Sequence, residues 1–389
     1  MYDLLLKGGT VIDPCQGIER TMSVAVKQGK IARLGENIDE KEAKKTLHLY
    51  QQLVCPGLID LHTHVYWGGT PLGVVADSIG LRSGVTTFVD AGSSGAANFL
   101  GFKEHIIKKS TCQIFAFLNI SYPGIFGFSA DLMYGESQHL ELLNVPAAVK
   151  VGKKYPQFIK GIKVRESMNS TGNQGLHPMH LAMRAAEELR KPLMVHIGKP
   201  PPDSRQILSF LREGDIITHA FRGNPNGLLD EKGYIAPELI EARKRGVIVD
   251  LGHGMGSLSF HVAEKMMEQG FFCDTISSDV HALSAGGPAF DLPTTMSKML
   301  NLGMPLSEVV RATTYKPALV LAEEDQIGHL QPGSIADIAV LELRQGKFEF
   351  YDGFEHKMVG NKRLFPILTC KEGKVFKALS SDSVMASQN

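Results

Sequence analysis

Eight short apolar segments recur between residues 54 and 281, and longer amphipathic stretches lie between them. Buried apolar strands that alternate with helices favour a parallel sheet covered by helices, and eight such units are typical of a closed barrel of about 250 residues. We therefore expect an α/β fold in which residues 55–328 form a (β/α)8 TIM barrel. The segments are VCPGLIDLH, GVTTFVDAG, IFAFLNIS, GIKVRE, PLMVHI, DIITHAF, GVIVDLGHG and DTISSDVH.

The helices are clearest in three of the intervening stretches. Residues 177–191, 235–246 and 260–270 carry apolar side chains at three- and four-residue spacing, which predicts amphipathic helices. The last two stretches end in Gly, a residue that is common just after the end of a helix.

The two ends of the chain have a different pattern. Residues 1–54 and 329–380 contain short segments that alternate apolar and polar residues, separated by Gly, Asp and Lys. This alternation is typical of antiparallel strands joined by turns. The sequence therefore predicts one small β-sandwich domain formed jointly by the N- and C-terminal segments.

Composition excludes several classes of function. The chain has 41 Lys and Arg against 41 Asp and Glu, so it has no net field to attract nucleic acid or an anionic membrane. No stretch approaches the ~20 apolar residues of a membrane span, and the first residues do not resemble a signal peptide. The five cysteines never form a CxxC pair, which argues against a disulfide framework or a thiolate zinc site. We expect a cytoplasmic protein whose partners are a small-molecule substrate and further copies of itself in a homo-oligomer.

Polar side chains stand at the ends of several predicted strands. Because side chains alternate faces along a strand, His62 and His64 point the same way. The carboxyl ends of barrel strands converge on one face, where barrel enzymes keep their active sites. A single histidine at a strand end is more often a structural residue than a ligand, but imidazole combined with carboxylate is what zinc selects. The combined set predicts a metal site made by His62, His64, Lys163, His196, His219 and Asp279.

Lys163 differs from the other members of this set. It interrupts the apolar strand GIKVR, and a buried amine is costly unless its charge is paired or removed. One interpretation is an ion pair with an acid such as Asp279 or Asp250. The other is that the neutral amine reacts with carbon dioxide, and that the resulting carbamate bridges two metal ions about 3.5–4 Å apart.

Several motifs, taken in order, resemble the amidohydrolase superfamily, in its dihydroorotase-like and deacetylase branch. They are PGLIDLHTH, GVTTFVDAG, the strand-end lysine, LMVHIG, ITHAF, SSD and PGSIADIAVLEL, and the resemblance covers nearly the whole chain. It implies a hydrolase with two divalent ions, expected to be Zn²⁺, and a carbamate on Lys163 that bridges them. It further implies that Asp279 is the catalytic proton shuttle. The implied ligands are His62, His64 and Asp279 on one ion and His196 and His219 on the other.

The substrate is where the sequence departs from the family pattern. True dihydroorotases resemble HxHxR, whereas Val65 and Tyr66 follow His64 here, so the arginine is missing. We therefore expect metal-bound hydroxide to attack an acyl ester or amide of a small hydroxy- or amino-acid-like substrate, as in a deacetylase or deacylase. Two alternatives stay open: a cyclic amidase that opens hydantoin or dihydropyrimidine rings, and a non-catalytic barrel that acts as a scaffold subunit.

Five further residues are candidates for substrate contact, each with a structural alternative. Arg165 could fork a substrate carboxylate or form a salt bridge between loops. His253 stands between glycines and could stabilise an oxyanion or only hold the turn. Tyr122 could hydrogen-bond the substrate or simply pack, and Gly286 and Gly287 could offer backbone amides or only form a turn.

Overall fold

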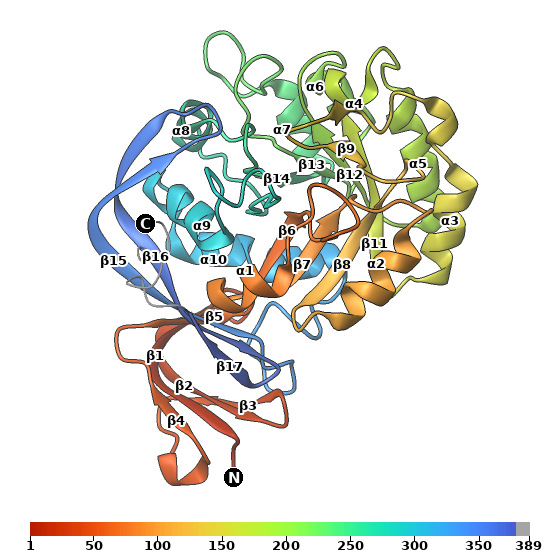
Figure 1. Cartoon of the computed structure of the whole chain (residues 1–389). Coiled ribbons are helices and arrows are strands. Elements are labelled where there is room, and N and C mark those ends of the chain that lie inside the picture. The colour runs from red at the N-terminus through yellow and green to blue at the C-terminus, as the bar shows by residue number, and fades with distance from the viewer. Residues whose placement is uncertain (379–389) are drawn as a thin grey trace.

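A seven-stranded parallel sheet forms the larger part of the protein, whose computed structural model describes residues 1–378 (Figure 1). Its strand order, β14-β13-β12-β11-β8-β7-β6, follows the chain, so each strand pairs with the one before it in the barrel. The strands are β6 (Leu58–Thr63), β7 (Val85–Ala91), β8 (Gln113–Asn119), β11 (Ile159–Glu166), β12 (Leu193–Ile197), β13 (Ile216–Thr218) and β14 (Ile248–Asp250).

Helices cover the outer side of this sheet (Figure 1). The three helices that the sequence predicts most clearly are present as α5, α7 and α8, and Gly246 and Gly270 follow the last two with positive φ. The helices are α1 (Ala76–Ser83), α2 (Phe99–His105), α3 (Val145–Lys154), α4 (Met168–Thr171), α5 (His177–Leu189), α6 (Ser204–Phe210), α7 (Pro237–Lys244), α8 (Phe260–Glu268), α9 (Leu292–Asn301), α10 (Leu306–Ala312) and α11 (Tyr315–Leu321). Short elements are β9 (Gly127–Phe128), β10 (Met133–Tyr134) and the 3₁₀ turns η1 (Glu40–Glu42), η2 (Ile107–Lys109) and η3 (Leu140–Leu142).

The eighth predicted strand closes the ring without becoming a regular strand. On one side of residues 274–280, the amide of Leu251 donates to Thr275 O at 3.0 Å. On the other side, the amides of Asp279 and His64 donate to His62 O at 2.8 Å and Val280 O at 2.9 Å. These bonds connect β14 to β6 and give a TIM-barrel-like fold. The ladder is interrupted because Asp279 adopts φ of 49°, which turns the chain out of the extended conformation.

Strands from both ends of the chain combine in a second sheet, as the sequence predicts. The strands are joined in one hydrogen-bonded sheet with the order β17-β16-β15-β5-β1-β2-β3, so a sandwich of two sheets is not confirmed. Residues 379 and 380 of the predicted domain lie outside the described residues. The strands are β1 (Leu4–Asp13), β2 (Ile18–Lys27), β3 (Lys30–Gly35), β4 (Thr46–His48), which pairs with β1, β5 (Leu53–Pro56), β15 (Ile338–Tyr351), β16 (Lys357–Lys371) and β17 (Lys374–Lys377).

The junction between the two sheets lies at Gly57, inside the segment VCPGLIDLH. The sequence predicts one strand there, but β5 joins the terminal sheet and β6 begins the barrel. A Cβ atom at Gly57 would lie 2.3 Å from Thr86 Oγ1, so only glycine fits this close passage. The long strands β15 and β16 then run from the terminal sheet along the barrel beside α9 (Figure 1).

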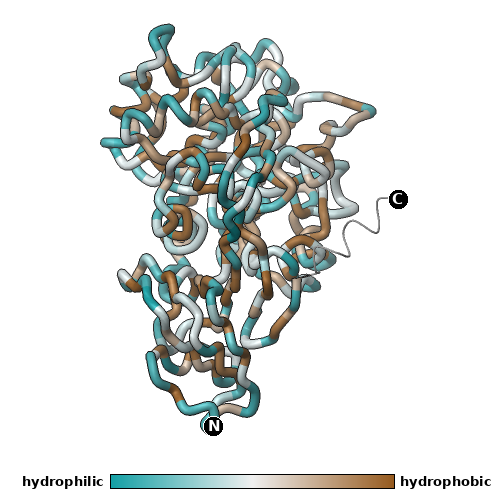
Figure 2. Tube along the Cα trace, turned by 90° about the vertical axis from the view of Figure 1, so that its left-hand side faces the viewer, coloured by the Kyte–Doolittle hydropathy of each residue, from teal (hydrophilic) through white to brown (hydrophobic). Residues whose placement is uncertain are grey.

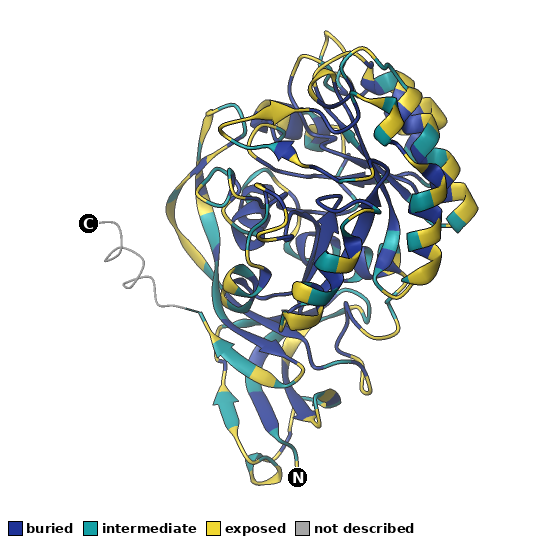
Figure 3. Ribbon diagram, turned by 45° about the vertical axis from the view of Figure 1, so that its right-hand side comes forward, coloured by how far each residue is buried: buried dark blue, intermediate teal, exposed yellow. Residues whose placement is uncertain are grey.

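The barrel strands are buried along their length, as expected for a parallel sheet covered by helices. In Figure 3 the strands are dark blue, whereas the outer helices are yellow on the side that faces solvent. Hydrophobic segments, brown in Figure 2, run through the interior of the barrel and recur in the terminal sheet. None of the helices in residues 1–378 is long and apolar enough to cross a bilayer.

A buried ion pair ties β16 to the start of the barrel and leads to a stability prediction. Lys371 Nζ lies 2.8 Å from Asp337 Oδ2, and the side chains are only 4% and 3% exposed. The carbonyl of Asp337 also accepts from the amide of Gly57 at 2.8 Å. Lys371→Met would leave Asp337 as a buried, unpaired carboxylate, so we expect it to lower the free energy of unfolding by about 3–5 kcal/mol in urea denaturation.

The matched control is Lys374→Met, which removes an exposed lysine from the neighbouring strand. We expect this control to change the stability by less than about 0.5 kcal/mol. Equal stability of the two variants would contradict a structural role for the buried pair.

Candidate metal centre

The six predicted ligand residues gather at the carboxyl ends of the barrel strands. The His62 and His219 ring centroids lie 5.0 Å apart, and the His196 and His219 centroids 4.3 Å apart. The six residues are spread from position 62 to position 279 of the chain, so the closure of the barrel is what brings them together. The six side chains come from β6 (His62), the residue after β6 (His64), β11 (Lys163), β12 (His196), the residue after β13 (His219) and the closing segment (Asp279).

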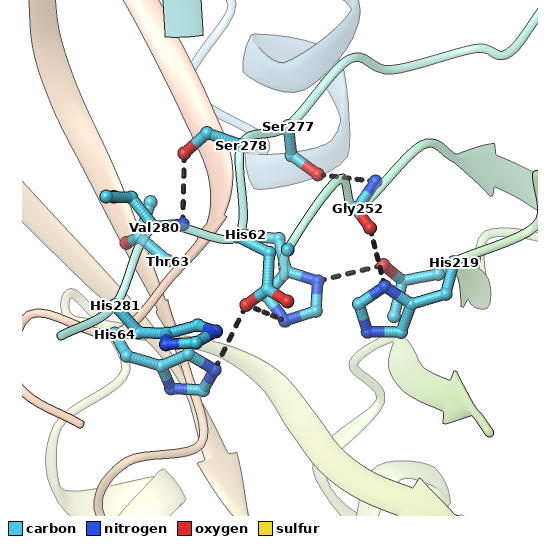
Figure 4. Close-up of polar contacts among 12 residues, drawn as sticks. His62, Thr63, His64, His219, Gly252, Ser277, Ser278, Val280 and His281 are labelled. Carbon is cyan, nitrogen blue, oxygen red and sulfur yellow. Dashed lines mark hydrogen bonds and ion pairs between the residues drawn. The ribbon is translucent and has the colours of Figure 1, made fainter. Parts of the chain in front are cut away.

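His62, His64 and Asp279 form the tightest group. The Nε2 atoms of both histidines lie 3.4 Å from Asp279 Oδ1, and one potential ligand atom from each of the three residues lies within 4.8 Å of the others (Figure 4). A Cβ atom at Gly254 would come within 2.4 Å of Asp279 Oδ2, so glycine lets the carboxylate take this place. The two ring nitrogens and one carboxylate oxygen are therefore close enough together to bind one metal ion.

A hydrogen-bond chain fixes the ring orientation of His62. Thr218 Oγ1 donates to Asp250 Oδ2 at 2.7 Å, so its lone pair is free to accept from His62 Nδ1 at 2.8 Å. Asp250 is buried and also accepts from the hydroxyls of Thr275 and Ser277. With its proton on Nδ1, His62 keeps the Nε2 lone pair for a ligand bond.

His219 is prepared in a similar way. Its Nδ1 lies 2.6 Å from the carbonyl of Gly252, and because a carbonyl can only accept, Nδ1 carries the proton. Nε2 is then an acceptor, and it is buried without a hydrogen-bond partner among the described residues. Burial lowers the pKa of His219 to about 3 and holds the pKa values of His62 and His196 well below their usual range. All three rings are therefore neutral, as metal ligands must be.

Lys163 is fully buried, and its Nζ lies 3.4 Å from His62 Nε2. Across residues 1–378 no carboxylate oxygen lies within 4.0 Å of this nitrogen, so the ion pair with Asp279 or Asp250, one of the two interpretations of Lys163, is absent. Burial lowers the pKa of the amine to about 7. A large fraction is thus uncharged at neutral pH, the form in which an amine can react with carbon dioxide.

These residues fit divalent ions on two observations. His219 Nε2 and Asp279 Oδ1 are buried polar atoms without hydrogen-bond partners in the described part of the chain, which is costly unless something binds them. The donors are imidazole nitrogens and a carboxylate oxygen, the set that zinc and similar ions select.

The structure gives Arg165 a different neighbour from the expected substrate. Its Nε donates to Glu136 Oε1 at 2.7 Å, and Nη2 donates to Glu136 Oε2. Both side chains are buried, and the Phe128 ring centroid lies 5.0 Å from the guanidinium carbon. Arg165 therefore forms a salt bridge, as the alternative from the sequence proposed, but the bridge joins β11 to the turn at Glu136 and not two loops.

His253 is buried and has no nitrogen left for a substrate. Nδ1 donates to the carbonyl of Gly254 at 2.8 Å, so Nε2 must accept, and it does so from Lys298 Nζ at 2.6 Å. The expected oxyanion contact is thus wrong for this conformation, and the structural alternative holds. Sequence reasoning missed Lys298 because a lysine in an amphipathic helix is normally exposed.

The other three substrate candidates lie on loops at the carboxyl-terminal end of the barrel. Tyr122 follows β8 and is 44% exposed, so its side chain is accessible from solvent. Gly287 has φ of 128° and its amide donates to Ser284 O at 3.0 Å, so it belongs to a turn. Gly286 has open space around its Cα.

Residues 53–376 match the amidohydrolase family, which is five-sixths of the chain. The chain belongs to this family. A deacetylase of Agrobacterium fabrum is 36% identical over 324 residues, covering 83% of this chain and 79% of the relative. A deacetylase of Enterococcus faecalis is 32% identical over 379 residues, covering 96% of this chain and 99% of the relative.

Solved structures of enzymes with other activities have a similar sequence identity to this amidohydrolase. A crystal structure of an adenine deaminase matches with a TM-score of 0.89 and 33% identity, covering 97% of this chain and 100% of that chain. A crystal structure of a dihydroorotase matches with a TM-score of 0.88 and 31% identity, covering 97% and 99%. The protein is therefore a hydrolase, which argues against the scaffold alternative, and members of this family generally use a divalent metal site.

The Thr218 hydroxyl gives a prediction about metal affinity. Thr218→Val keeps the shape of the side chain but removes the acceptor for His62 Nδ1, so the ring loses the bond that fixes its orientation. We expect the affinity for Zn²⁺, measured by competition with a chromophoric chelator, to fall about 10- to 100-fold. The control is Thr87→Val, which removes a buried hydroxyl that has no hydrogen-bond partner among the described residues. Equal affinities in both variants would contradict the orienting role of Thr218.

Proposed function

We propose that the protein is a binuclear metal-dependent hydrolase that cleaves an acyl ester or amide bond of a small hydroxy- or amino-acid-like substrate. The observation that carries the proposal is the convergence of histidine nitrogens, Asp279 and the amine of Lys163, which has no carboxylate partner among the described residues, at one barrel mouth. The relatives that span most of the chain and bear a deacetylase name support an acyl substrate. The missing arginine of the HxHxR pattern speaks against dihydroorotate.

The ligands in this proposal divide between two divalent ions. His62, His64 and Asp279 would hold one ion, His196 and His219 the other, and a carbamate on Lys163 both. Such ions, expected to be Zn²⁺, lower the pKa of a water molecule and polarise an acyl carbonyl.

Asp279 is the residue that we propose to move the proton. Burial raises its pKa, but the surrounding imidazoles outweigh that effect and hold the pKa well below its usual range, so the carboxylate is ionised. Its Oδ1 makes no hydrogen bond with any described residue and lies among the potential ligand atoms of the site. It is therefore able to accept a proton from the attacking water and pass it to the leaving group.

A hydrolysis screen on zinc-loaded protein tests the proposed substrate class. The panel contains O-acetyl hydroxy acids and N-acyl amino acids of both hands, together with dihydroorotate, hydantoins, dihydrouracil and adenine. We expect turnover of acyl acids with a preference for one enantiomer, because the buried, hydrogen-bonded side chains around the metal-ligating residues form a chiral site. Release of acetate or of the free amine is measured.

Each other result of the screen has a definite meaning. Turnover of the cyclic amides alone would replace the deacylase with a ring-opening amidase, and turnover of adenine alone would replace it with a deaminase. Inactivity of metal-replete protein on the whole panel would contradict the proposed function.

The carbamate gives a separate prediction. Lys163→Ala removes the amine that carries it, so we expect purified protein to retain less than half of the wild-type zinc, measured by elemental analysis. Addition of a small carboxylic acid such as propionate should restore metal, because its oxygens can occupy the vacated space. Lys153→Ala, which removes an exposed lysine from α3, is the control. Full zinc content in Lys163→Ala without added acid would rule out the carbamate.

A further inference from the structure

Arg222 is a buried cation that lacks an acidic partner. It follows β13 by four residues, and its side chain is among the buried charged groups at 7% exposure. Within residues 1–378 no carboxylate oxygen lies within 4.0 Å of its guanidinium. Burial lowers the pKa of Arg222, and no acidic side chain offsets this effect.

The guanidinium of Arg222 is hydrogen-bonded to β12 beside His196, and the backbone of Arg222 is hydrogen-bonded to His219. Nη1 donates to the carbonyl of Ile197, the residue after His196, at 3.0 Å. The amide of Arg222 donates to the carbonyl of His219 at 3.2 Å. Nε is buried and has no hydrogen-bond partner in the described structure, so most of the N–H donors of the guanidinium are unused.

Such an arrangement is costly without a counter-ion. An arginine stays protonated in proteins, so a desolvated guanidinium cannot lower the cost by losing its proton. The best partner is a planar anion that accepts two parallel hydrogen bonds, which is the geometry of a carboxylate. Because the protein itself supplies no such group, the structure favours an external one.

The other buried cations at this end of the barrel are already engaged. Arg165 forms its two-pronged pair with Glu136. Lys298 Nζ donates to His253 Nε2 and to the carbonyls of Pro288 and Tyr351, at 2.6, 2.7 and 2.7 Å. The donors of both cations are therefore engaged within the protein, and neither is available to pair with a substrate carboxylate.

We infer that Arg222, and not Arg165, binds a carboxylate of the substrate, so that the substrate is an anionic acyl acid. The inference rests on the proposed function and narrows its substrate class. The carboxylate would lie beside the His196 and His219 strand ends, with the acyl carbonyl directed toward the histidines and Asp279. Selection between an acyl acid and its neutral analogue then depends on one guanidinium.

The test compares one acyl acid with its uncharged counterpart. The substrates are the O-acetyl hydroxy acid that the wild type hydrolyses best and the same molecule with the carboxylate replaced by a primary carboxamide. In Arg222→Gln we expect KM for the anion to rise about 10- to 100-fold, the range for a lost charge-assisted hydrogen bond. KM for the carboxamide should change far less, so the preference for the anion collapses.

Two further variants define the effect. Arg222→Lys keeps the charge but loses the planar fork, so we expect an intermediate rise in KM for the anion. Arg184→Gln removes an exposed arginine from the outer face of α5 and should leave both KM values unchanged. Zinc content and thermal unfolding of each variant report on folding.

The outcomes separate this inference from the proposed function. If the wild type hydrolyses acyl acids but Arg222→Gln loses both substrates equally, Arg222 is structural and the inference is overturned. If the wild type hydrolyses neither substrate, the proposed function fails, and calorimetric binding of the free hydroxy acid to wild type and Arg222→Gln decides the role of Arg222 alone: equal affinities overturn it. If Arg222→Gln does not fold, an unchanged KM for the anion in Arg222→Lys overturns the inference.

Discussion

The hydrogen bonds made by Nδ1 of His62 and of His219 are the interactions on which the candidate metal centre depends. His62 is held through Thr218 by the buried carboxylate of Asp250, and His219 by the carbonyl of Gly252. Because Nδ1 of each ring carries the proton and donates it to these bonds, the Nε2 lone pairs are left to bind a metal ion. Burial keeps the rings neutral, so the interior is already prepared for a cation before one binds.

The loop after β14 carries much of this preparation, and the far end of the chain braces it. Gly252 supplies the carbonyl for His219, and Gly254 leaves room for the carboxylate of Asp279. Between them, His253 is held by Lys298, which also binds the carbonyl of Tyr351 at the end of β15. Strand β15, which begins in the terminal sheet, thus helps to hold the loop after β14 beside the ligand residues. This contact links the sheet formed by the two chain ends to the candidate metal centre.

Charge balance distinguishes two buried arginines at the carboxyl ends of the barrel strands. Arg165 and Glu136 neutralise one another, and Phe128 covers the pair, whereas Arg222 is buried without an acid. The fold alone does not specify the substrate, since a deaminase and a dihydroorotase share this fold with the protein at TM-scores of 0.89 and 0.88. Specificity in such a family resides in the few side chains around the mouth of the barrel.

The sequence by itself determined the barrel, the combination of both chain ends in one β domain and the residues that converge as candidate ligands; that this domain is a single sheet came only from the structure. It did so because strand parity and the direction of parallel strands are local properties that fix where a side chain points. Only the tertiary structure decided that Arg165 pairs with Glu136, that His253 is bound by Lys298 and that Arg222 lacks a partner. Each of these depends on segments at least 25 residues apart in the chain that meet in space, and no periodicity in the sequence records which of their groups meet.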